Sequence, residues 1–490
     1  MDSSQLYEPL AGKAGRVFAA EGKAERSRWW VLFLYMLLAI TQGATWNVFA
    51  PISDALETAY GSTWNGSFIA LLLNVSSGTF FIWLQPTSVA IDRYGVRAVT
   101  IFSSTVLAAS CLMRCAPLEG AGLRNAMMLS FILNGFSGCW LNFGGPVISE
   151  VWFPQKERTL ATSLGATSTY IGSSAGFLAG PLIVGSPDTE GAARHYILLL
   201  HMLWAGVSTV TCLCCWCYYP DCPTSPPSEA AAKKKREAAE ALPPGPTTWR
   251  DLLVGSTDRL FCASSEIERG QRKRFWLITI CLAVPLGVYQ GWLATFHLSC
   301  PELSSNQAGW LGCTMTLSGC VGSVAVGALL DRFNGRLKST ICVLLFLAAA
   351  SFGVFAAAAT GIESTVFLFV FGILGGMMYN TTTPLYFELA METIYGWASE
   401  NAASMVLILV NTIFQIAYVA LPQKMGGTVQ WPGFLAVATL VGSFVLLSAI
   451  PVRYFRLEED LSATRFEAGS GKPVGSPFDR RGCIEVGVVR

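Results

Sequence analysis

Two short charged turns, at corresponding places in the two halves of the chain, constrain its fold more than any other sequence feature. The first, Asp92–Arg97, reads Asp-Arg-Tyr-Gly-Val-Arg, and the second, Asp331–Arg336, reads Asp-Arg-Phe-Asn-Gly-Arg. Each lies between two apolar runs, and its glycine permits a tight connection between them. The acid can pair with a neighbouring base or face a helix N-terminus. One such turn is weak evidence, but two at matching positions predict a chain built from two related halves.

Apolar runs of about 20 residues recur along the sequence, and each is long enough to cross a bilayer. Of the 490 residues, 52% are hydrophobic and only 13% are charged, as expected when most of a chain does not face water. This pattern predicts an all-α membrane protein with twelve transmembrane helices in two six-helix bundles. We predict spans at 29–51, 66–91, 98–116, 126–148, 159–184, 196–219, 275–298, 309–330, 338–359, 364–388, 400–422 and 430–452.

Polar segments divide the chain into a tail, two bundles, a linker and a second tail. The linker contains several prolines and the basic run Lys233–Arg236, a composition that cannot bury a core. We interpret the basic run as a topology anchor, so no nucleic-acid partner is expected. The predicted division is a tail at 1–28, bundles at 29–219 and 275–455, a linker at 220–274, and a tail at 456–490.

The distribution of lysine and arginine predicts that both termini are cytosolic. In that orientation, 29 of the 33 basic residues fall in cytosolic segments, and the opposite orientation fits badly. The four predicted to lie on the outer side are Arg114, Arg124, Arg194 and Lys424.

No catalytic or metal-binding set emerges from the sequence, so we expect neither an enzyme nor a cofactor. There is no glycine-rich phosphate loop and no supported Ser-His-Asp set. The cysteine cluster 212–217 contains no histidine or acid, which argues against a metal site. It is interpreted as helix filler, with palmitoylation at Cys217 or Cys222 as the alternative.

Charged residues at membrane depth are costly and therefore call for a role. Glu150 and Glu388 end spans four and ten, after Pro-Val-Ile-Ser and Pro-Leu-Tyr-Phe respectively, on the same side as the two charged turns. A clamp that closes only in one state would bias a two-state rocking motion. The alternatives are a proton-carrying Glu388 or a purely structural ion pair. The predicted clamps are Asp92, Arg93, Arg97 and Glu150 in the first half, and Asp331, Arg332, Arg336 and Glu388 in the second.

Aromatic and amide side chains near mid-depth are the candidates for contacting a solute. Span one contains Gln-Gly followed by Trp46, and span seven contains Gln-Gly-Trp ending at Trp292. Aromatic rings can stack on a flat heterocycle or present a negative face to a cation. For each ring the alternative is core or lipid packing. The predicted substrate-binding set is Trp46, Asn47, Tyr170, Tyr289, Trp292, Phe296, Asn411 and Gln415.

Two further positions suggest coupling and sorting roles. His297 follows Trp292 near the outer end of span seven, where it would be placed to sense protons; a hydrogen-bonded structural histidine is the alternative. In the N-terminal tail, Tyr7-Glu8-Pro9-Leu10 is a tyrosine-x-x-apolar pattern of the kind that sorting adaptors read. Tyr7 and Leu10 are therefore the candidate sorting residues.

Several local stretches extend the pattern of the paired turns. They are Arg28-Trp29-Trp30, Gln42-Gly43 with Trp46-Asn47, Ala59-Tyr60-Gly61, Pro285-Leu286-Gly287-Val288 with Gly291-Trp292, Ala308-Gly309-Trp310, Phe387-Glu388-Leu389 and Glu392-Thr393-Ile394-Tyr395. The turns resemble those of the major facilitator superfamily, and the added stretches are similar to solute carrier family 49, from about residue 28 to 455. That resemblance implies a carrier whose cavity is lined at Trp46, Tyr170 and Gln415.

The resemblance also implies a cargo and an address. One branch of the family exports pyridoxine from the lysosome with protons, and sister branches are linked to choline, ethanolamine and haem. This chain departs from the branch in two ways: its acidic dileucine signal is broken because Leu10 is followed by Ala11, and His297 stands where the branch has an acid.

We therefore expect an alternating-access transporter in the lysosomal membrane, with the plasma membrane as the alternative location. Its expected partners are a small-molecule solute, protons, the lipid bilayer and sorting adaptors. Pyridoxine is the favoured cargo, with choline, ethanolamine or haem as alternatives. A non-transporting membrane sensor or scaffold is the alternative of another class.

Overall fold

A computed structural model of the chain is helical throughout the part that it describes, which confirms the predicted all-α class. The described residues are 27–142, 144–221, 223, 266–294, 303–332, 337–361, 365–394, 400–424 and 431–449. In the first half, the helices are α2 (Ser27–Asn47), η1 (Ala50–Ile52), α3 (Ser53–Tyr60), η2 (Ser62–Trp64), α4 (Gly66–Met113), α5 (Gly120–Leu141), α6 (Gly144–Trp152), α7 (Gln155–Ile183) and α8 (Glu190–Cys217). In the second half, they are α12 (Glu266–Ala294), α14 (Ser305–Arg332), α15 (Leu337–Gly361), α16 (Thr365–Ile394), α17 (Glu400–Lys424) and α18 (Trp431–Ala449).

Seven helical segments among the described residues are long and apolar enough to cross a membrane. Other helices are comparably long but more polar: α7, for example, is rich in glycine, serine and threonine. Such residues suit helix–helix interfaces inside a membrane, where close approach replaces hydrophobic contrast. The total of twelve spans stays a prediction.

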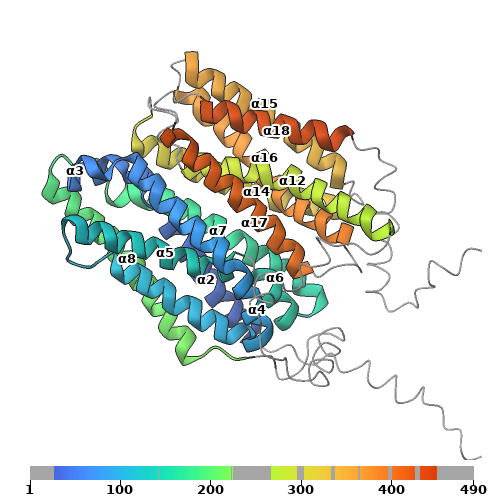
Figure 1. Ribbon diagram of the computed structural model, residues 1–490, viewed down its shortest axis with the longest axis horizontal. Helices are drawn as coiled ribbons and strands as arrows, with labels where there is room; N and C mark the ends of the chain where they lie inside the picture. The colour runs from blue at the N-terminus through green and yellow to red at the C-terminus, as the bar shows by residue number, and fades with distance from the viewer. Residues whose placement is uncertain are drawn as a thin grey trace, which may run out of the picture.

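The helices form two groups that follow the order of the chain. Figure 1 shows the blue-to-green helices of the first half beside the yellow-to-red helices of the second. Across the boundary, α7 packs against α14 and α4 packs against α17. Ala50 and Phe177 of the first half are buried in the core cluster of the second, and Met405 of α17 is buried in a cluster of the first. The bundle boundaries themselves stay a prediction.

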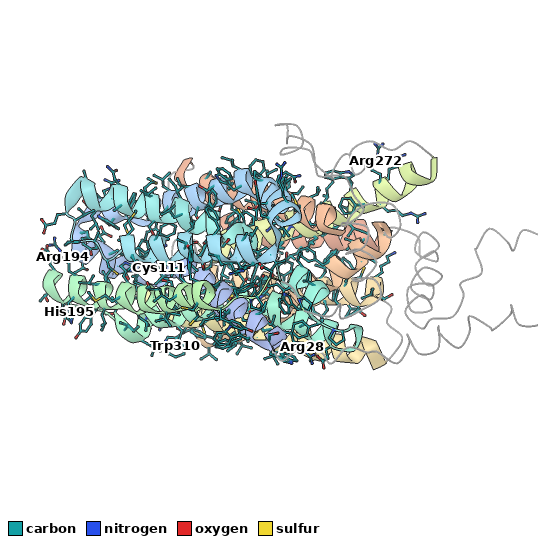
Figure 2. All side chains as sticks on the ribbon, turned by 90° about the horizontal axis from the view of Figure 1, so that it is seen from below. Arg28, Cys111, Arg194, His195, Arg272 and Trp310 are labelled. Atoms are coloured by element: carbon teal, nitrogen blue, oxygen red, sulfur yellow. The ribbon has the colours of Figure 1, made fainter. Side chains whose placement is uncertain are left out.

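Charged side chains mark the two ends of the molecule. Figure 2 places Arg28 and Arg272 toward one end, and Arg194 and His195 at the opposite end. We call these the Arg28 end and the Arg194 end. This separation agrees with the predicted placement of these arginines on opposite sides of the membrane, although the cytosolic location of the termini stays a prediction.

The first charged turn is a kink inside one continuous helical segment. Gly95, within α4, has φ 80° and ψ 169°, a backbone conformation that residues with a Cβ rarely adopt. Predicted spans 66–91 and 98–116 therefore lie on the two sides of this glycine, as expected. In the second turn, the described residues end with α14 at Arg332 and resume with α15 at Leu337.

Among the predicted span boundaries that differ from the structure, three have a clear local cause. Predicted span one continues to residue 51, whereas α2 ends at Asn47 before the proline-containing turn η1. Predicted span four is continuous, but α5 ends at Leu141 because Asn142 caps it: the Asn142 Nδ2 donates to the Gly138 carbonyl at 2.9 Å. In addition, α12 begins at Glu266, inside the predicted linker, because its charged first turns are good helix formers that hydropathy does not detect.

Glycines bring the first and fifth predicted spans of each half into backbone contact. A Cβ added to Gly43 of α2 would lie 2.6 Å from the Thr169 carbonyl oxygen of α7. In the second half, a Cβ on Gly291 of α12 would lie 3.2 Å from the Gln415 carbonyl oxygen of α17. The pair α2–α7 therefore has a counterpart in α12–α17, which agrees with an internal repeat.

Candidate solute-binding site

Polar side chains from both halves meet where α7 approaches α14 and α16. Tyr170 of α7 is half-buried. Its hydroxyl lies beside Thr383 of α16 and near Cys320 of α14. Tyr170 is therefore a predicted site residue that the structure places on the boundary between the halves.

Two more tyrosines, from the second half, lie within electrostatic range of Tyr170. The rings of Tyr289 and Tyr379 are 4.9 Å apart between centroids. Each phenol is close enough to that of Tyr170 for the two groups to interact electrostatically. The Asn380 Nδ2 donates to the Tyr289 hydroxyl at 3.2 Å. We call Tyr170, Tyr289 and Tyr379 the three-tyrosine cluster. Tyr289 is 4% exposed and Tyr379 is 1% exposed, so their rings and hydroxyl groups would reach a solute only after the boundary opens.

An amide pair lies further along α12 and α17. The Asn411 Nδ2 donates to the Gln290 Oε1 at 3.0 Å, and Gln290 is half-buried. Gln415 follows Asn411 by one helical turn and is 8% exposed, as is Asn411. These groups can accept and donate hydrogen bonds without carrying charge.

Trp46 and Asn47 occupy the last turn of α2, and both are half-buried. Trp46 packs against the hydrophobic cluster that contains Val48 and Phe49. The Asn47 Nδ2 donates to the Gly43 carbonyl at 3.4 Å. Part of each side chain therefore remains accessible at the point where the helix ends.

Trp292 has different surroundings from Trp46, although both follow a Gln-Gly sequence. Trp292 is 1% exposed. Its ring lies edge-on to Phe352 and to Phe355, at 5.5 Å between centroids in each case. This burial favours core packing, the alternative left open by the sequence, rather than contact with a solute.

The predicted clamp in the first half gains an unexpected participant. The Arg97 Nη1 lies 3.1 Å from a carboxylate oxygen of Asp221, which follows α8. Arg93 is exposed. Both clamps and the coupling and sorting roles stay predictions, because most of their residues lie outside what the structure describes. It leaves out the side chains of Asp92, Glu150, Asp331, Arg332 and Glu388. It leaves out the whole of Arg336, Phe296, His297, Tyr7 and Leu10.

Replacing Arg97 with alanine is expected to lower the free energy of unfolding by less than about 1 kcal/mol, because both partners are exposed and solvent screens them. Arg97 is 44% exposed and Asp221 is 69% exposed. Thermal unfolding of purified protein measures the change. A loss several times larger, with Asp221→Ala having no effect, would contradict the Asp221 pairing and favour the predicted clamp.

At the Arg194 end, a charged cluster closes α3 onto α8. Arg194 pairs with Glu190 at 2.6 Å and donates through Nε to the Ala59 carbonyl at 2.9 Å. Burial raises the pKa of the neighbouring Tyr60 phenol, and the Arg194 guanidinium partly offsets that rise. Tyr60 therefore stays protonated at acidic and neutral pH.

Sequence reasoning missed four residues of the site: Gln290, Tyr379, Asn380 and Thr383. A signal was present, because residues 379–383 form a run of polar side chains in the middle of an otherwise apolar span. All five are buried, and buried polar groups in a membrane helix mark interfaces or functional sites. Among the described residues, no group of histidine, cysteine or acidic side chains could hold a metal ion.

Comparisons with known proteins bear on the family and the fold of the chain. The family model of the Major Facilitator Superfamily matches residues 31–422. The chain is 31% identical to a solute carrier family 49 member 4 homolog of Xenopus laevis, covering 85% of this chain and 88% of that protein. It is 24% identical to the choline/ethanolamine transporter flvcr2a of Danio rerio, covering 86% of each. The xylose transporter XylE of E. coli shares the fold, with a TM-score of 0.62, 12% identity, and coverage of 87% and 98%.

Proposed function

Because this chain belongs to the major facilitator superfamily, within solute carrier family 49, we propose that its solute binds between the two halves and crosses by alternating access. The chain is a membrane transporter and not an enzyme. The contact of Tyr170 with Thr383 across the boundary supports this site most directly. Rocking of the two halves would open such a boundary to one side of the membrane at a time.

The proposed cargo is a small uncharged aromatic solute with several hydroxyl groups, pyridoxine or a related vitamin. The side chains named for the site are aromatic rings, amides and hydroxyls, and none carries a charge. Rings can stack on a pyridine, and the pair Gln290–Asn411 can exchange its internal hydrogen bond for bonds to hydroxyl groups.

Choline or ethanolamine is the second candidate cargo. The three-tyrosine cluster offers aromatic faces of the kind that bind quaternary ammonium groups. The relatives named as choline/ethanolamine transporters add support.

The proposal also includes coupling, location and sorting. Protons would couple through Glu388 or His297, and adaptors would bind at Tyr7 and Leu10. The protein would lie in the lysosomal membrane with cytosolic termini.

Competition between the two cargoes on purified protein tests the proposal. We expect pyridoxine to raise the melting temperature, because a ligand that binds only the folded state stabilises it, and choline to do so less at equal concentration. Tyr170→Phe removes the hydroxyl and keeps the ring, so it should weaken pyridoxine binding severalfold and leave choline binding unchanged.

Two results would count against the proposal, one against its cargo and one against transport. Stabilisation by choline alone would favour the second candidate. Binding of either solute without flux into reconstituted vesicles would favour a sensor over a carrier.

A further inference from the structure

Arg114 is a buried cation at the Arg194 end of α4. It falls in predicted span 98–116, among the four basic residues predicted to lie on the outer side, and it is 3% exposed. Its Nε donates to the Ser130 hydroxyl at 2.7 Å, and its Nη1 donates to the Thr45 carbonyl at 2.8 Å. The guanidinium also lies 4.6 Å from the ring centroid of Phe131 and 5.6 Å from that of Phe49. Burying a charge is costly unless such partners compensate; these contacts offset part of that cost, and Nη2 is buried without a hydrogen-bond partner among the described residues.

The Thr45 carbonyl belongs to the last turn of α2, which ends at Asn47. The last four carbonyl groups of a helix lack partners within the helix. A cation there satisfies one carbonyl and interacts favourably with the helix dipole. Arg114 therefore caps the end of α2 from a different helix.

A second hydrogen-bonded chain holds the same turn. The Asn134 Nδ2 donates to the Thr45 hydroxyl at 2.8 Å, and the Gln42 Nε2 donates to the Asn134 Oδ1 at 3.2 Å. On another side of α2, Gly43 allows backbone contact with α7. The end of α2 is thus fixed by α4, α5 and α7 together.

The segment that follows α2 seals the Arg194 end between the halves. Phe49, which lies against Arg114, leads directly into η1, and η1 contacts α14. A Cβ added to Gly309 of α14 would lie 2.9 Å from the Pro51 Cβ of η1 and 2.7 Å from the Pro181 Cγ of α7. We call Pro51, Pro181 and Gly309 the Arg194-end seal. These surfaces leave no room for a side chain at position 309, so their fit depends on where η1 lies.

Span nine, the counterpart of the span that carries Arg114, cannot supply a matching cation, because no lysine or arginine occurs between Lys338 and Lys424. The Arg114 cap therefore has no counterpart from span nine, and it acts on the part of the seal that η1 provides.

We propose that Arg114 is a positioning residue that holds η1 in the shape required to close the Arg194-end seal. This role for Arg114 rests on the alternating-access function proposed above, but not on any choice of cargo. Removing the cap frees the end of α2 and Phe49, and the population should shift toward states in which this end is open.

Cys313 provides a native reporter for the seal. It is 5% exposed, and it follows Gly309 by one helical turn of α14, so both lie on the same face. N-ethylmaleimide is added to purified full-length protein, and the labelling rate of Cys313 is followed by mass spectrometry. The Cys313→Ser variant identifies the signal.

In Arg114→Met, we expect Cys313 to be labelled about tenfold faster, a change equivalent to ~1.4 kcal/mol in the opening equilibrium. Arg114→Lys keeps the charge but loses the planar guanidinium that reaches two acceptors at once, and should increase the rate by only about threefold. Arg124→Met is the matched control, because Arg124 lies over Phe68 at the same end. Its labelling rate should equal that of the unchanged protein.

Two outcomes would overturn the proposal. In the first, an Arg114 variant melts at a lower temperature but its Cys313 is labelled no faster than in Arg124→Met. Arg114 would then stabilise the core without positioning η1. The other is an unchanged labelling rate in both Arg114 variants. Because no solute is added, failure of the proposed cargo or binding site would leave this measurement unaffected.

Discussion

Replacing Trp46 with alanine is expected to weaken solute binding roughly ten- to thirtyfold while the protein still folds. Trp46 is half-buried, so part of its ring remains available to a solute at the end of α2. A stacking or cation–π contact in a dry site contributes about 1–2 kcal/mol, and about 1.4 kcal/mol is tenfold in affinity. Titration calorimetry on the purified protein, with pyridoxine and with choline, measures the loss.

Two variants control for packing. Trp46→Phe keeps a smaller aromatic face and should recover part of the affinity. Trp292→Phe changes a tryptophan that is 1% exposed, so it should lower the melting temperature and leave affinity within about twofold, because a cavity destabilises a core. Normal affinity in Trp46→Ala, or failure of that variant to fold, would mean that Trp46 serves packing.

Gly172→Ala is expected to destabilise the first half by about 3 kcal/mol or more, because overpacking an interface forces its backbones apart. A Cβ on Gly172 of α7 would collide with the backbone of Ile40 in α2. A backbone, unlike the tip of a flexible side chain, cannot move aside alone. Size-exclusion profiles and melting temperatures in detergent measure the effect.

Gly206→Ala in α8 is the matched control for that prediction. A Cβ there would meet no atom within 4 Å, so the change should be neutral or slightly stabilising, since alanine favours helices over glycine. Equal melting temperatures for the two variants would show that α2 and α7 can separate cheaply. The rigid units proposed for alternating access would then have to be reconsidered.

The glycine contacts also bear on how the halves move. Because α2 is held against α7 and α12 against α17 by backbone contact, these pairs are expected to move as units. Motion would then be concentrated where side chains rather than backbones meet. The contact of Tyr170 with Thr383 is of that kind.

The sequence by itself determined the helical class, the division into apolar segments and the kink at Gly95. These properties are local: hydropathy over a span and the conformational freedom of glycine do not depend on distant residues. The repeated Gln-Gly and Asp-Arg patterns indicated two related halves. The boundaries at Asn47, Leu141 and Glu266 were harder to predict, because caps and charged helical turns leave hydropathy unchanged.

Only the tertiary structure decided which side of each helix faces what. Trp46 and Trp292 share a local sequence pattern. Of the two, Trp292 is the one that packs against Phe352 and Phe355. The sequence places Arg114 near the outer end of predicted span 98–116, but only the structure shows that the carbonyl of Thr45 and the rings of two phenylalanines hold it in the core. Tyr170 and Thr383 are far apart along the chain and meet only because α7 packs against α14, which lies beside α16. Burial and partners depend on neighbours that the fold brings together, and a one-dimensional pattern does not contain them.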